Sequence, residues 1–89
     1  MEFTLEFFGN ERYNMLKFLS THQTEIKGEL VVSMSQQDIG DTMHISKLKT
    51  NEILNELQDE GFISVPRRSR YKLTEKGAKA LKLMEKKNV

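Results

Sequence analysis

Two helix starts stand close together in the middle of this chain, and the pair constrains the fold more than any other feature. Ser35 can cap a helix through its side-chain oxygen, and Asp38 follows at the position of an acidic partner, close to a capping box. Ser46 offers a second cap after a gap that has room for only one short helix and a turn. The sequence therefore predicts a helix over about 36–43, a tight turn, and a second helix over about 47–60.

The segments around this pair complete an order of elements. Asn10 suits a helix start, Gly61 suits a left-handed helix end, and Thr74 suits another cap. Residues 1–8 alternate apolar and polar until Phe8 breaks the pattern, so they are left unassigned. The expected elements are a helix over about 11–22, a strand over about 29–34, hairpin strands over 62–65 and 71–73, and a helix over about 75–87.

The length and composition limit the class of protein. A chain of 89 residues allows one domain, and we expect residues 1–89 to form it. No apolar run reaches the length of a membrane span, so we expect a soluble protein without membrane contact. Without cysteine there is no disulfide or thiolate metal site, and no secretory leader pattern is visible, which favours a cytoplasmic protein.

The charge is divided unevenly along the chain. Residues 1–46 carry three basic and seven acidic side chains, a net charge of −4. Residues 47–89 carry eleven basic and six acidic side chains, a net charge of +5. A polyanion would be attracted to the second part and repelled by the first, which points to nucleic acid as a partner of the second part.

The order of elements is that of a winged helix-turn-helix domain. The stretch 35–63 resembles bacterial winged helix-turn-helix regulators in its capped start, its Ile39-Gly40 pair, its Ile45-Ser46 turn and its closing Gly61-Phe62-Ile63. The stretch 71–77 resembles the wing exit of MarR-type and related transcription regulators. The resemblance implies an α+β, mainly α, fold with a three-helix core, a β-hairpin wing over about 62–73 and a C-terminal helix. It also implies sequence-specific binding to double-stranded DNA as a transcription regulator.

The predicted helix at 47–60 has an inward and an outward face. Thr50, Ile53, Leu54 and Leu57 recur at helical spacing and turn inward, which leaves the other side for a major groove. Asparagine can contact adenine through both amide atoms, leucine can pack on a thymine methyl, and lysine suits phosphate or guanine. The DNA-binding residues expected here are Ser46, Lys47, Leu48, Lys49, Asn51 and Asn55.

Three arginines gather in the predicted wing, at Arg67, Arg68 and Arg70. This is more positive charge than a soluble turn requires, so we expect these side chains to contact a minor groove or its flanking phosphates. Two acidic residues argue the other way. Glu52 and Glu56 lie on or beside the DNA-facing side of the helix and would repel phosphates.

Two alternatives use the same fold. A strand followed by a capped helix-turn-helix also resembles the winged domains of plasmid or phage replication initiators. The other alternative is a protein-interaction module, in which Glu52 and Glu56 face a partner protein. For DNA binding we expect a homodimer, because one small DNA-binding domain contacts few base pairs. The apolar residues available for that contact are Phe3, Leu5, Phe7, Phe8 and Leu83.

The sequence contains no motif for catalysis. A nucleophile elbow, a phosphate-binding loop and a zinc-binding HExxH are all absent. His22 and His44 are far apart in the sequence and have no cysteine partners. We therefore expect no enzyme activity, cofactor or metal, and the sequence names no small-molecule effector.

Overall fold

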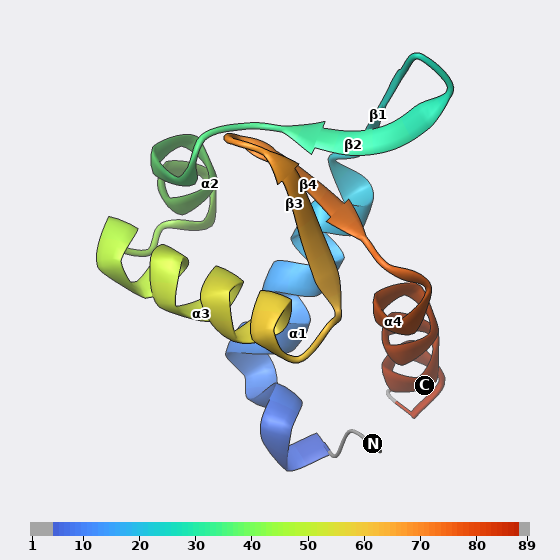
Figure 1. Ribbon diagram of the computed structural model, residues 1–89. Coiled ribbons are helices and arrows are strands. Elements are labelled where there is room, and N and C mark those ends of the chain that lie inside the picture. Colours follow the sequence, from blue (N-terminus) through green and yellow to red (C-terminus); the bar gives the residue numbers. More distant parts are fainter. Residues whose placement is uncertain (1–4, 88–89) are drawn as a thin grey trace.

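The computed structural model describes the backbone of residues 5–87 and the side chains of residues 11–85. A helix and a β-hairpin are followed by two helices, a second β-hairpin and a last helix (Figure 1). The elements are α1 (Leu5–Thr21), β1 (Thr24–Ile26), β2 (Glu29–Ser33), α2 (Gln36–Met43), α3 (Lys47–Asp59), β3 (Ile63–Arg67), β4 (Arg70–Leu73) and α4 (Glu75–Lys87). This is the α+β winged helix-turn-helix fold that the sequence predicts.

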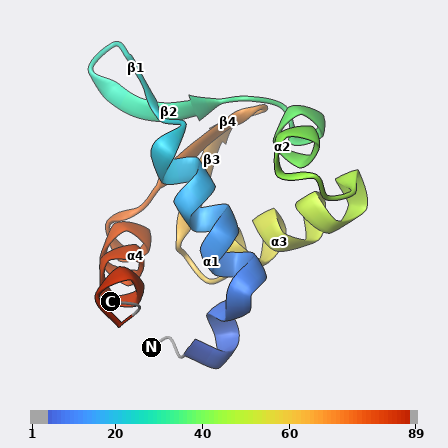
Figure 2. The ribbon, with the colours of Figure 1, turned by 180° about the vertical axis from the view of Figure 1, so that it is seen from behind.

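One antiparallel sheet, in the order β1-β2-β4-β3, joins the two hairpins. On the back of the molecule α1 passes between α3 and α4 and packs against both (Figure 2). The core lies where these helices meet the sheet, because each element turns its apolar side chains there. Its largest fully buried side chains are Phe62, Met15, Leu16, Leu19, Ile39, Leu54, Leu57 and Val32.

Local caps position the helix pair. The Ser35 hydroxyl accepts from the Asp38 amide at 3.1 Å, and the Ser46 hydroxyl accepts from the Lys49 amide at 3.0 Å. Between them His44 ends α2 in the left-handed conformation, with φ 62°. The predicted starts of α2 and α3 are thus confirmed. Gly61 follows α3 with φ +80°, as expected for a residue just beyond a helix end.

The two helices of the pair approach most closely at Gly40. A Cβ on this residue would lie 2.8 Å from Thr50 Oγ1 and 3.0 Å from the Ile45 carbonyl oxygen, so a larger side chain would push α2 and α3 apart. Thr50 is fully buried, and its hydroxyl donates to the Ser46 carbonyl at 2.8 Å. This polar group is therefore satisfied inside the core.

The structure differs from the sequence prediction at two places in the N-terminal part. The helix begins at Leu5 and not at Glu11, so Gly9 and Asn10 lie inside α1. One glycine costs a helix only about 1 kcal/mol, and a cap signal has no effect where the preceding residues are already helical. Residues 1–4, which include Phe3, lie outside the described residues, and the side chains of Leu5, Phe7 and Phe8 also lie outside them.

The hairpin formed by β1 and β2 is the second difference, because only β2 was expected. Lys27 and Gly28 make its turn with φ 52° and 84°, and Ile26 pairs with Glu29 across it. Both turn residues have positive φ, as type I′ hairpin turns require. The segment 24–26 is short and exposed, with one apolar residue, so no hydrophobic pattern marked it as a strand.

Candidate nucleic-acid interface

The face of α3 that the core does not cover is a candidate interface with DNA. Ile53, Leu54 and Leu57 are buried on one side of the helix. On the other side Leu48 is 77% exposed, although it is a large apolar residue of a kind that is usually buried. Lys47 and Asn55 are also exposed, and Asn51 is half-buried. The structure therefore presents these predicted residues on the open side of α3.

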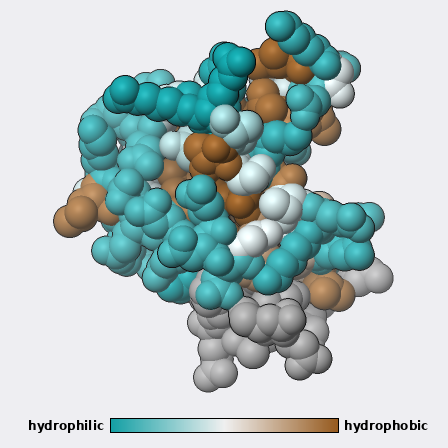
Figure 3. Space-filling model, viewed as in Figure 1, coloured by the Kyte–Doolittle hydropathy of each residue, from teal (hydrophilic) through white to brown (hydrophobic). Residues whose placement is uncertain are grey.

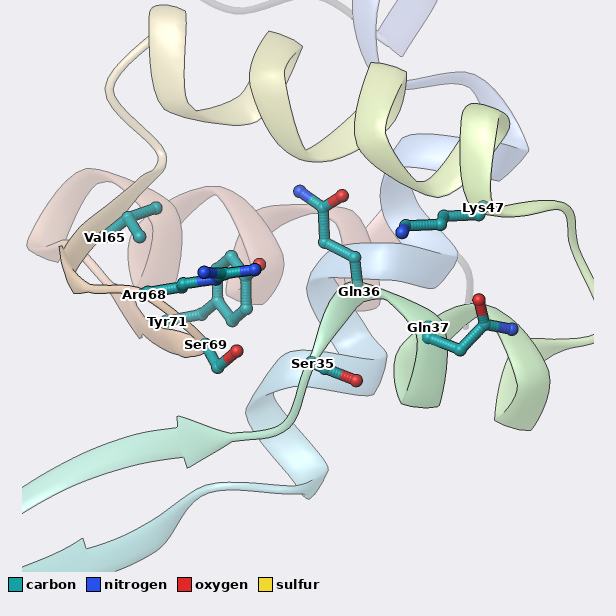
Figure 4. A pocket seen from close by; sticks show the side chains of 8 residues that line it. All are labelled: Ser35, Gln36, Gln37, Lys47, Val65, Arg68, Ser69 and Tyr71. Atoms are coloured by element: carbon teal, nitrogen blue, oxygen red, sulfur yellow. The ribbon is translucent and has the colours of Figure 1, made fainter.

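A groove runs between the helix pair and the wing. It has a volume of about 380 Å³ and is lined by residues from the start of α2, the start of α3 and the β3–β4 hairpin: Ser35, Gln36, Gln37, Lys47, Val65, Arg68, Ser69 and Tyr71. Figure 4 shows Lys47 on the helix side and Arg68 on the wing side, with Gln36 between them. Two cations on opposite walls suit an anionic chain such as a phosphate backbone.

The wing arginines are not equivalent. The turn consists of Arg68 and Ser69, whereas Arg67 and Arg70 face each other as a strand pair. The strands therefore extend beyond the predicted 62–65 and 71–73, which leaves a turn of two residues. Among the described residues, Arg67 and Arg68 have no ion-pair partner, while Arg70 Nη1 donates to Ser33 Oγ on β2 at 2.6 Å.

Most of the charge on the flank of α3 is paired within the domain. Lys49 Nζ lies 3.1 Å from Glu11 Oε1 and 3.7 Å from Glu52 Oε1. The hydrogen bond to Glu11, with the charge of that carboxylate, raises the pKa of Lys49 above its usual value. Glu56 lies against α1, with its Oε1 2.7 Å from Arg12 Nη2. The two carboxylates that argued against DNA binding thus each have a cationic neighbour.

Side-chain amides connect α2 and α3. Asn51 Nδ2 donates to Gln36 Oε1, and Asn55 Nδ2 donates to Asn51 Oδ1, both at 3.1 Å. Sequence reasoning placed Asn51 and Asn55 on this face but missed Gln36. A polar residue directly after a helix cap is common, and no signal in the sequence shows that it reaches the next helix.

Most of the surface on the side viewed in Figures 1 and 3 is hydrophilic, with small hydrophobic areas between the helices and the strands. No helix in the described part of the chain is long and apolar enough to cross a membrane. Within that part, no three side chains of the kinds that ligate metal ions come together.

The fold and this face can be compared with known proteins. The model of the Crp-like helix-turn-helix domain matches residues 14–84, which is most of the chain. The chain belongs to the Crp-like helix-turn-helix domain family. Membership supports DNA-binding transcription regulation as the function of this Crp-like domain. The narrower resemblance to MarR-type regulators is not supported, because the family model that matches is the Crp-like one.

Solved structures show the same fold at low sequence identity. The Crp-like domain is similar to the reduced CO-sensing protein from R. rubrum, with a TM-score of 0.69 and 20% identity over 83% of this chain and 37% of that one. For a CRP-family transcriptional regulator from Thermus thermophilus, the TM-score is 0.63 and the sequence identity 20%, over 79% of this chain and 38% of that one. For the CO-dependent transcription factor CooA from Carboxydothermus hydrogenoformans, the TM-score is 0.66 and the sequence identity 14%, over 89% of this chain and 38% of that one. No significant match is found among curated protein sequences. The chain spans well under half of the length of these solved structures.

Proposed function

We propose that this Crp-like domain binds double-stranded DNA sequence-specifically, with α3 in the major groove and the arginine wing on the flanking backbone or minor groove. The observation that carries the proposal is the groove that has Lys47 on one wall and Arg68 on the other. DNA with its major groove on α3 would bring phosphates to these cations. The same placement leaves the exposed side of α3 against base edges.

Each residue on this face has a role that suits its chemistry. Asn51 and Asn55 would read base edges, and Leu48 would pack on a thymine methyl group. Lys47, Arg67 and Arg68 would contact phosphates, because their charges have no carboxylate partner among the described residues. Several members of the proposed set already hold bonds within the domain that DNA would have to replace or share: Ser46, Lys49, Asn51, Asn55 and Arg70.

The role as a transcription regulator is favoured over the two alternatives. Membership of the Crp-like family favours regulation over replication initiation. The protein-interaction module needed Glu52 and Glu56 to be available to a partner. Both lie beside a cation of this chain, which weakens that alternative. We further propose that the domain acts on DNA as a homodimer, for which Leu83, 49% exposed on α4, is an available apolar contact.

Selection of bound sequences from a random duplex pool tests the proposal. We expect enrichment of one motif, a two-fold symmetric motif if a dimer binds, and an affinity that falls steeply with salt. The control is a protein in which Lys47 and Arg68 are both replaced by Gln, which should bind all duplexes less tightly. A pool without enrichment and without salt-dependent binding would contradict the proposal and favour the interaction module.

A further inference from the structure

We propose that Gln36, the first residue of α2, is a positioning residue for base recognition. It would hold the Asn51 amide, and through it the Asn55 amide, in the orientation that reads DNA. The inference rests on the proposed DNA-binding function and extends it to a residue outside α3. Its basis is a hydrogen-bonded line of three amides that crosses from one helix to the other.

The line leads from the helix interface to the surface. Gln36 and Asn51 are half-buried and Asn55 is exposed. Each of the two hydrogen bonds measures 3.1 Å, and in each the amide nitrogen of the later residue donates to the oxygen of the earlier one. The Asn55 oxygen therefore lies at the outer end of the line, on the side of α3 proposed to face the major groove.

The hydrogen bonds couple the orientations of the three amides. A side-chain amide has its donor and its acceptor at similar positions, and the torsion that exchanges them is soft. If one amide turned alone, nitrogen would face nitrogen or oxygen would face oxygen in this line. Adenine recognition needs the asparagine donor and acceptor in one particular order. The line from Gln36 fixes the orientations of the three amides relative to one another before DNA arrives, which lowers the entropy lost on binding.

The backbone around Gln36 fixes its position relative to α3. It follows directly after the Ser35 cap, and α2 is held against α3 by the close approach at Gly40. Its neighbour Gln37 lines the same groove but behaves differently, because its Nε2 donates to Asp41 Oδ1 within α2 at 2.9 Å. Gln37 is thus a matched control, with the same side chain one position away and no link to α3 in the described structure.

The first measurement uses the free protein. In Gln36→Met, which keeps the length of the side chain but removes its amide, the NMR signals of the Asn55 side-chain amide should shift, because Asn51 links the two residues. Gln37→Met should leave them in place. Gln36→Glu retains the accepting oxygen and should preserve the Asn51 signals more closely than Gln36→Met. An unchanged Asn55 amide in Gln36→Met would overturn the coupling.

The second measurement compares the duplex selected from the pool with a scrambled duplex at one salt concentration. Gln36→Met should lower the ratio of the two affinities by about tenfold and change the affinity for scrambled DNA by less than about twofold. Because Gln37 lines the groove, Gln37→Met should change both affinities by the same factor and so keep the ratio. Gln36→Glu should lower both affinities through its charge but retain the ratio. The double variant Gln36→Met/Asn51→Ala should have the same ratio of affinities as Asn51→Ala alone, because Gln36 acts through Asn51.

The outcomes separate this inference from the proposed function. If the unaltered domain prefers no duplex, the proposed function fails and the inference fails with it. If it selects a sequence but Gln36→Met keeps the full ratio, only the inference is wrong. If the two changes in the double variant add, Gln36 contacts DNA itself and is not a positioning residue. Thermal melting verifies that each variant is folded, and Gln36→Ala replaces Gln36→Met if that protein is unfolded.

Discussion

Arg12 Nη2 on α1 lies 2.7 Å from Glu56 Oε1 on α3. A cation from outside the helix-turn-helix pair therefore lies beside a carboxylate on the flank of the proposed DNA-binding face. The pair is partly exposed, and its contribution to folding stability is therefore small. Its effect on the electrostatic potential near the DNA-binding face is larger than its effect on stability. With Arg12 in place, the negative charge of Glu56 is compensated close to where phosphates would lie.

The first prediction follows from this pair. Arg12→Met should weaken binding to all duplexes by about threefold at low salt and less at high salt, because Glu56 then repels phosphates. Arg12→Met/Glu56→Gln should recover most of the loss. Lys17→Met removes the same charge from the Lys17–Glu85 pair between α1 and α4 and is the matched control. Equal losses in Arg12→Met and Lys17→Met would show that only net charge matters.

The second prediction concerns the wing. Arg67→Ala/Arg68→Ala should weaken binding to preferred and scrambled duplexes equally and lower the slope of log affinity against log salt by about 0.9 for each lost phosphate contact. Affinities at two salt concentrations measure both effects. Lys79→Ala, an exposed change on α4, should alter neither. A wing variant that loses only its preference for the selected duplex would mean that the wing reads bases.

The third prediction concerns base recognition by α3. Asn51→Ala or Asn55→Ala should cost about 1–3 kcal/mol on the selected duplex and little on scrambled DNA, because amides read base edges and not phosphates. Leu48→Ala should cost less, since only an apolar contact is lost. Titrations with both duplexes test this. Equal losses on the two duplexes would assign these residues to backbone contacts.

The fourth prediction concerns stability and a glycine of α4. A Cβ on Gly77 would overlap the Phe62 carbonyl oxygen, which is backbone and cannot turn away. Gly77→Ala should therefore lower the free energy of unfolding by about 3 kcal/mol or more. Gly28→Ala is the control. Its φ is +84° with no atom within 4 Å of the added Cβ, so only backbone strain of about 1 kcal/mol applies. Urea unfolding measures both, and similar losses would contradict the overlap.

The fifth prediction concerns assembly. Light scattering at tens of micromolar should give the mass of a dimer, and Leu83→Glu should reduce that mass if α4 supplies the contact. Leu30→Glu changes another exposed leucine, on β2, and is the control. A monomeric mass for the unaltered domain would remove the homodimer proposal and leave the DNA-binding proposal in place.

Features that depend on neighbouring residues could be predicted from the sequence. Ser35 and Ser46 bind amides three residues ahead, so the starts of α2 and α3 follow from short-range chemistry. The spacing of Thr50, Ile53, Leu54 and Leu57 likewise defines the buried side of α3, because the helical rotation per residue is constant. The exposed side, with Leu48 and Asn55, follows as its complement.

Features that depend on how one element pairs or packs with another were decided by the tertiary structure. The short strand β1 exists because a positive-φ turn at Lys27 and Gly28 folds it back onto β2. The pairing of Arg67 with Arg70, the ion pair of Lys49 with Glu11, and the bond from Asn51 to Gln36 each join residues of different elements. Such bonds depend on how the elements pack in space, and a one-dimensional pattern of residue types does not contain that information.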